Sequence, residues 1–166
     1  MKDSQMIQIL YEAYGKELFL YLYSLCKNPH QAEDLLQETY VKALLSLSMQ
    51  HGNMRAWLYL VARNLCFNAM KKEKHTVPAE VSQEKCAEPG ILEQYIQKEQ
   101  NRALYRAVAR LPSKKREIVQ LQYFSGLRLK EIAQILQISP ENARVLSCRA
   151  KRELKLYLEE EGYELS

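Results

Sequence analysis

Apolar residues recur along most of this 166-residue chain at the three- and four-residue spacing of an α-helix. The first such segment runs from Ile7 to Leu25, and Gly15 is expected to bend or split it. Asn28 followed by Pro29 predicts an N-cap and a first helical position. Helices are then expected through AEDLLQETYVKALLSL and RAWLYLVARNLCFNAMKK, with a loop at 46–54 between them.

The pattern changes at 74–91, where HTVPAEVSQEKCAEPG holds two prolines and a glycine but no helical stripe. A helix is expected from Leu92 to about Arg110, followed by a break at LPS, a helix through KKREIVQLQYFSG and a short helix through LKEIAQIL. Strand-like alternation is absent from the whole sequence. We therefore predict an all-α protein of two small helical domains, 1–73 and 92–166, joined by a flexible linker at 74–91.

The stretch LKEIAQIL-QI-SPENARVLSCRAKREL has the length and rhythm of a helix-turn-helix. Ser139 is suited to cap its second helix and Pro140 to start it. At 100° per residue, one face of that helix is expected to pack inward: Ala143, Ser147, Ala150, Leu154 and Leu158. A second face is expected to be free to enter a DNA major groove: Glu141, Arg144, Cys148, Lys151, Arg152 and Lys155.

The distribution of charge supports a nucleic-acid partner more than the total charge does. The chain carries only +4, but residues 92–158 carry 14 basic and 6 acidic side chains. The tail after them holds Glu159, Glu160, Glu161 and Glu164. On the helix, arginine can pair with guanine O6 and N7, and Asn142 can read adenine. Lys151, Arg152 and Lys155 lie further along and are expected to contact phosphates.

Several other kinds of protein are disfavoured. The four cysteines form no CxxC pair, and His30, His51 and His75 complete no metal-ligand spacing, so we expect reduced thiols and no metal or cofactor. The N-terminal MKDSQMIQIL lacks the apolar region of a signal peptide, and no apolar run approaches the ~18–20 residues that cross a bilayer. The protein is therefore expected in the cytoplasm. No nucleophile–base pair or phosphate-binding glycine loop points to an enzyme.

Three stretches resemble a known family. LPSKKREIVQLQYFSGLRLKEIAQILQIS is similar to region 4 of extracytoplasmic-function (ECF) sigma factors, small bacterial transcription initiation factors. AEDLLQETYVKAL resembles region 2.2 of the same family, and RAWLYLVARN resembles regions 2.3–2.4. The resemblance covers nearly the whole chain apart from the linker and the tail.

The resemblance implies a sigma factor that binds core RNA polymerase, directs it to −35/−10 promoters and captures the melted −10 strand. Asp34, Gln37 and Glu38 are then expected to face the coiled coil of the polymerase β′ clamp, while region 4 meets the β flap. Asn64 matches a position that holds a flipped −10 base, together with the loop at 46–54. Basic side chains expected to hold the strand are Arg63, Lys71, Lys72 and Lys74. An anti-sigma factor is an implied partner.

In region 4, Arg144 and Arg149 match positions that contact the −35 element, and the family also has a basic residue at Lys151. The other expected −35 contacts are Asn142, Val145, Cys148 and Arg152.

The chain departs from the family pattern in two places. Gln137 stands where the turn usually has glycine, so the turn either avoids positive φ or strains Gln137. Residues 145–148 read Val-Leu-Ser-Cys where the family often has Ser-Arg-Leu-His, which puts Ser147 in place of a core leucine. Val145 can instead meet a thymine methyl. Trp57 shares a stripe with Leu60, Val61 and Asn64 and is expected in the core.

Two alternatives remain. The chain could be a conventional helix-turn-helix regulator with an N-terminal dimerisation or sensor domain, although such a domain needs neither AEDLLQETY nor AWLYLVARN. An enzyme is the other alternative, and the chain shows no constellation of residues for one.

Overall fold

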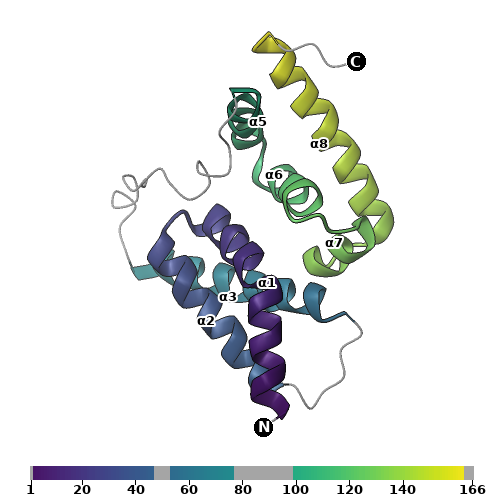
Figure 1. Ribbon diagram of the computed structural model, residues 1–166. Helices are drawn as coiled ribbons and strands as arrows, with labels where there is room; N and C mark the ends of the chain where they lie inside the picture. Colours follow the sequence, from purple (N-terminus) through teal and green to yellow (C-terminus); the bar gives the residue numbers. More distant parts are fainter. Residues whose placement is uncertain (1, 47–52, 77–98, 163–166) are drawn as a thin grey trace. The chain divides into compact units, whose positions relative to one another are not determined.

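The computed structural model describes residues 2–46, 53–76 and 99–162, drawn as coloured ribbon in Figure 1. These residues form helices and contain no strand, so the all-α prediction is confirmed. The chain divides into two units, Met1–Pro89 and Gly90–Ser166. Most of the predicted linker, including Cys86, lies outside the described residues.

The first unit consists of α1 (Lys2–Cys26), α2 (Pro29–Leu45) and α3 (Met54–Thr76). The turn between α1 and α2 is short because Asn28 caps α2 directly. Its side-chain oxygen accepts hydrogen bonds of 2.9 and 3.1 Å from the backbone N–H groups of His30 and Gln31. The predicted N-cap is thus confirmed. Gly15 lies within one continuous helix, so the expectation that it splits α1 is wrong.

The three helices bury a common core around Leu18, Leu22, Leu36, Leu58 and Tyr59. Tyrosine hydroxyls in this core find partners, as buried polar groups must. Tyr40 donates a hydrogen bond of 3.0 Å to the carbonyl of Leu10 and ties α2 to α1. Burial disfavours the phenolate and raises the pKa of Tyr40 above its ordinary value.

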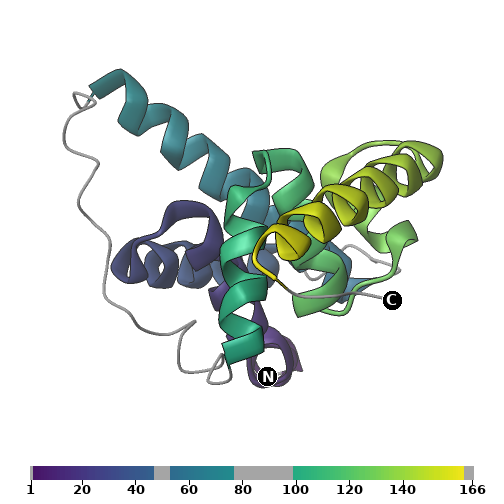
Figure 2. The same cartoon turned by 90° about the horizontal axis from the view of Figure 1, so that it is seen from above.

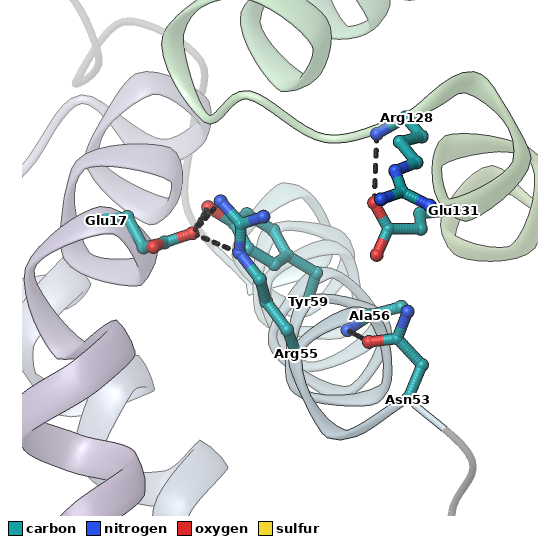
Figure 3. Close-up of polar contacts among 7 residues, drawn as sticks. All are labelled: Glu17, Asn53, Arg55, Ala56, Tyr59, Arg128 and Glu131. Atoms are coloured by element: carbon teal, nitrogen blue, oxygen red, sulfur yellow. Dashed lines mark hydrogen bonds and ion pairs between the residues drawn. The ribbon is translucent and has the colours of Figure 1, made fainter.

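Glu17 of α1 fixes the first turns of α3 (Figure 3). Its carboxylate accepts hydrogen bonds from Arg55 Nε at 2.9 Å and from the Tyr59 hydroxyl at 2.8 Å. The helix itself is capped by Asn53, whose side-chain oxygen accepts from the Ala56 N–H at 3.0 Å. The start of α3 is therefore set by its own cap and by a half-buried ion pair to a neighbouring helix.

The second unit consists of α5 (Glu99–Arg110), α6 (Ser113–Val119), the π-helical segment η2 (Gln120–Phe124), α7 (Leu129–Leu136) and α8 (Pro140–Glu160). The predicted helix through KKREIVQLQYFSG thus changes to a single π-helical turn halfway along. The core of the second unit is built from Ile118, Leu121, Ile132 and Ile135. α8 packs against α5, α6 and α7.

Acidic residues that the sequence assigns to a tail hold the end of α8 instead. α8 extends to Glu160, and its last turns lie beside α5 (Figures 1 and 2). Glu160 forms an ion pair of 3.1 Å with Arg110, and Glu161 forms one of 2.7 Å with Arg106. The Arg110 guanidinium also lies 4.0 Å from the centre of the Tyr157 ring. These acids therefore neutralise α5 locally.

The turn between α7 and α8 requires a left-handed residue. Gln137 has φ +59° and ψ +48°, so of the two alternatives the strained one is correct. This conformation ends α7 after Leu136 and lets the Ile138 N–H reach the Ala133 carbonyl at 3.0 Å.

We predict that Gln137→Gly raises the free energy of unfolding of the second unit by up to about 1 kcal/mol, because glycine adopts positive φ without a steric penalty. Gln137→Val should lower it, since a β-branched side chain fits this conformation worst. Urea unfolding of the full chain, followed by circular dichroism, measures both. The control is Gln134→Gly, an exposed position inside α7, which should cost about 1 kcal/mol. Equal losses for the two glycine variants would contradict the prediction.

Candidate nucleic-acid interface

Capping interactions define the two helices of the helix-turn-helix. The Glu131 side chain accepts a hydrogen bond of 2.9 Å from the Arg128 N–H and starts α7 (Figure 3). Ser139 Oγ accepts one of 3.0 Å from the Asn142 N–H, and Pro140 occupies the first position of α8. Both sequence predictions for the start of α8 are confirmed.

The inward face of α8 is the predicted one. Ala143, Ser147, Ala150 and Leu158 are buried, and Leu154 is half-buried. The residues expected to contact the −35 element are all exposed: Asn142, Arg144, Val145, Cys148, Arg149, Lys151 and Arg152. The structure therefore brings all seven to the solvent side of one helix.

These seven side chains do not form one line. Arg149 lies five positions after Arg144, which places the two about 140° apart around the helix axis. Cys148, Arg152 and Val145 lie between them by the same periodicity. The two arginines therefore occupy opposite flanks of the exposed face.

The unusual serine in α8 has a specific partner. Ser147 is 3% exposed, and its hydroxyl donates a hydrogen bond of 2.7 Å to the side-chain oxygen of Gln122 in η2. The polar group that replaces a core leucine is thus satisfied, which removes the cost of burying it. Val145, two residues earlier and on the exposed face of α8, is 46% exposed.

The outer face of α3 carries the residues expected at the −10 element. Asn64, Lys71 and Lys72 are exposed and follow one another at helical spacing. Asn68, which the sequence reasoning missed, is exposed on the same face, four residues after Asn64. The four-residue spacing from Asn64 could have shown that Asn68 lies on the same helix face. Arg63 differs, because it is half-buried and its guanidinium lies 4.6 Å from the centre of the Phe67 ring.

Trp57 is half-buried, so its prediction as a core residue is wrong. The core stripe of α3 is formed by Leu58, Tyr59, Ala62 and Cys66, which are all fully buried. By helical periodicity, Trp57 lies on the opposite side of the helix, in line with Asn64. It therefore borders the same outer face.

The third set of predicted residues lies on α2. Asp34, Gln37 and Glu38 are exposed on one face of this helix, opposite its buried residues Ala32, Leu35 and Thr39. The same face continues as an apolar surface that the sequence reasoning did not single out: Val41, Leu44 and Leu45, which are 55%, 43% and 78% exposed. The face thus changes from acidic to apolar along the helix.

Some predicted parts of the site fall outside the described residues. They include 47–52, the centre of the predicted −10 loop, and the Lys74 side chain. Within the ranges that the structure covers, no group of three His, Cys, Asp or Glu side chains is arranged to hold a metal ion. Over the same ranges, no helix is both long and apolar enough to cross a membrane.

Two family models match the chain, one in each unit. Residues 10–76 match sigma-70 region 2, and residues 101–154 match sigma-70 region 4. The ECF RNA polymerase sigma factor SigM of Bacillus subtilis is 31% identical, over 90% of this chain and 93% of its own. The RNA polymerase sigma factor YlaC of the same organism is 29% identical, over 93% of each chain.

Solved structures show the same similarity. Sigma factor RpoE of Bartonella quintana, solved in complex with the anti-sigma factor NepR, is similar with a TM-score of 0.74 and 27% identity, covering 96% of this chain and 98% of that one. CnrH, solved with the cytosolic domain of CnrY, shares the fold with a TM-score of 0.66, at 18% identity over 94% of this chain and 89% of that one. The chain therefore belongs to the ECF group of the sigma-70 family, the sigma factors that direct RNA polymerase to promoters.

Proposed function

We propose that the chain uses three separate helix faces for promoter-directed initiation. The outer face of α2 binds core polymerase, the exposed face of α8 reads the −35 duplex, and the outer face of α3 holds the melted −10 strand. The observation that carries this proposal is the exposure of all seven expected −35 residues on α8, the capped second helix of the helix-turn-helix. In this proposal residues 1–73 and 92–166 act as the two functional domains, with 74–91 between them.

At the −35 element, the first turns and the later turns of α8 have different chemistry. Arg144 lies in the first turns of α8, the part of a recognition helix that reaches base edges, and can pair with guanine O6 and N7. Asn142 can read adenine from the helix start, and Val145 can meet a thymine methyl. Lys151 and Arg152 lie further along and contact phosphates. Cys148 and Arg149 complete the contact surface.

At the −10 element, α3 offers amides and cations to an unpaired strand. Flipping a base out of the duplex costs a few kcal/mol of stacking, so a protein that melts DNA needs groups that recover this energy. Asn64 and Asn68 can hydrogen-bond a base edge, while Lys71, Lys72 and, at the side, Arg63 hold the backbone. The half-buried Trp57 offers part of an aromatic ring on the same side of α3, two helical turns before Asn64.

At the polymerase, Asp34, Gln37 and Glu38 contact the β′ clamp, and the second unit contacts the β flap. An acidic and amide surface on α2 suits a basic partner. RpoE and CnrH were each solved with a protein partner, and for RpoE that partner is an anti-sigma factor. This supports an anti-sigma factor as a regulatory partner of this chain. The chain itself acts as a binding factor in the cytoplasm, without a cofactor and without enzymatic chemistry of its own.

Transcription in vitro tests the proposed function directly. Core polymerase with the purified full chain and fragments of genomic DNA should yield transcripts from defined start sites, whereas core alone should yield none. Mapping those start sites also supplies the −35 and −10 sequences. A protein that footprints duplex DNA without polymerase, and gives no defined transcript with it, would be a conventional regulator instead.

Arg144→Ala should weaken binding to the mapped promoter by about 1–3 kcal/mol and relax the preference at a single −35 base pair. The reason is that a bidentate pair with guanine discriminates against the other bases, whereas a phosphate contact does not. Competition between promoter variants substituted at each −35 position measures this. Lys155→Ala, further along the same helix, is the matched control and should weaken all variants uniformly. Uniform weakening by Arg144→Ala would mean that Arg144 contacts only phosphate.

Asn64→Ala should spare closed-complex formation and impair open-complex formation, because the amide meets a base only after melting. Permanganate reactivity of unpaired thymines measures opening, and a filter assay in the cold measures the closed complex. Gln31→Ala, a half-buried position on α2, is the control and should change neither.

The fluorescence of Trp57, the only tryptophan in the chain, offers an independent readout. Single-stranded oligonucleotides with the mapped −10 sequence should change the emission of the full chain, and Asn64→Ala should require higher concentrations for the same change. Equal loss of closed and open complexes in Asn64→Ala would refute the role in base capture.

A further inference from the structure

Two consecutive side chains of η2 contact α8 at positions one helical turn apart. Gln122 accepts the 2.7 Å hydrogen bond from Ser147, and the Lys151 ammonium lies 5.6 Å from the centre of the Tyr123 ring. Residues 147 and 151 are neighbours on the surface of α8 because they are four positions apart. The π-helical segment is thus joined to the exposed helix α8 by one partly buried hydrogen bond and one exposed cation–π contact.

We propose that Tyr123 is a positioning residue for the −35 contact. Its ring holds the Lys151 ammonium at the edge of the exposed face of α8, where the ammonium meets a phosphodiester of the duplex. This inference rests on the proposed function, because that function gives Lys151 its DNA partner. It adds a residue outside the helix-turn-helix to the promoter interface, acting through a side chain of α8.

The exposure of both side chains supports this role over a structural one. Tyr123 is 53% exposed and Lys151 is exposed, so the pair contributes little to the core. A lysine has many rotamers, and fixing it on a phosphate costs conformational entropy. An aromatic face that already confines the ammonium lowers this cost before DNA binds.

The hydrogen bond between Ser147 and Gln122 supplies the fixed distance that such positioning needs. Ser147 lies on the buried face of α8, and Gln122 directly precedes Tyr123 in η2. The bond therefore fixes the separation between η2 and α8 next to the ring. A leucine at position 147 could not accept or donate this bond, which gives the departure from the family pattern a physical consequence. Single π-helical turns occur frequently at functional sites.

A double-mutant cycle on closed complexes tests the proposal. Core polymerase with the full chain is bound, in the cold, to a duplex that carries a promoter mapped by the transcription experiment. Tyr123→Ala and Lys151→Ala should each weaken binding by about two- to fivefold. The double variant should bind no more weakly than Lys151→Ala alone. Lys151→Ala should also lower the slope of log K against log salt concentration by about one.

Conservative variants of Tyr123 separate the effect of its aromatic face from the effects of its hydroxyl and its volume. Tyr123→Phe keeps the aromatic face and should bind like the wild type, whereas Tyr123→Leu fills similar space without that face and should resemble Tyr123→Ala. Phe124→Leu is the matched control, since Phe124 is the next residue in η2 and is 55% exposed, and it should leave binding unchanged. The losses should be the same on a duplex with a scrambled −35 element, because phosphate contacts carry no sequence information.

Additive losses for Tyr123→Ala and Lys151→Ala would overturn the proposal, because Tyr123 would then contact DNA by itself. Wild-type binding by Tyr123→Leu would also overturn it, since the aromatic face would not be needed. Both outcomes leave the proposed function intact. A wild-type protein that forms no promoter-specific complex with polymerase would refute the proposed function itself.

Discussion

The close approach of α8 to the rest of its unit determines which side chains reach DNA. Three of the residues on its buried face are small, namely Ala143, Ser147 and Ala150, so α8 can lie near the backbones of α6 and α7. Once this face is buried, the helical period leaves no choice about the outer face. Enlarging any of the three would rotate or displace the helix and move Arg144 and Arg149 together. Packing, rather than charge, therefore sets the geometry of the interface.

In the first unit, polar contacts set the orientation of the helix proposed to contact DNA, α3. α3 must present Asn64 and Asn68 outward while its other side is buried by α1 and α2. Glu17 fixes the first turns of α3 by accepting hydrogen bonds from both Arg55 and Tyr59. Because the pair is only partly exposed, solvent screens it less than a surface pair. The orientation of the amides thus depends on a carboxylate in another helix.

Local chemistry made much of this structure predictable from the sequence. The starts of α2 and α8 could be predicted from Asn28–Pro29 and Ser139–Pro140, because capping depends on adjacent residues alone. The outward set on α8 was equally predictable, since its small inward residues contrast with the charges opposite. Trp57 was not. α3 has two apolar stripes, one through Trp57 and Leu60 and one through Leu58 and Ala62, and periodicity alone does not say which one the neighbouring helices bury.

The prediction that the glutamates near the C-terminus form a tail was wrong for a related reason. A run of glutamates suggests a solvated tail, but Glu160 and Glu161 find arginines on α5 some fifty residues earlier in the chain. Such pairs depend on tertiary structure and leave no local signal. They also change the electrostatics of the unit. Arg106 and Arg110 are neutralised by these partners, whereas Arg144, Lys151 and Arg152 remain exposed on α8. The positive charge of this unit is thereby concentrated on α8, the helix proposed to face DNA. The C-terminal acids thus lower the net charge of the chain without lowering the positive charge on α8.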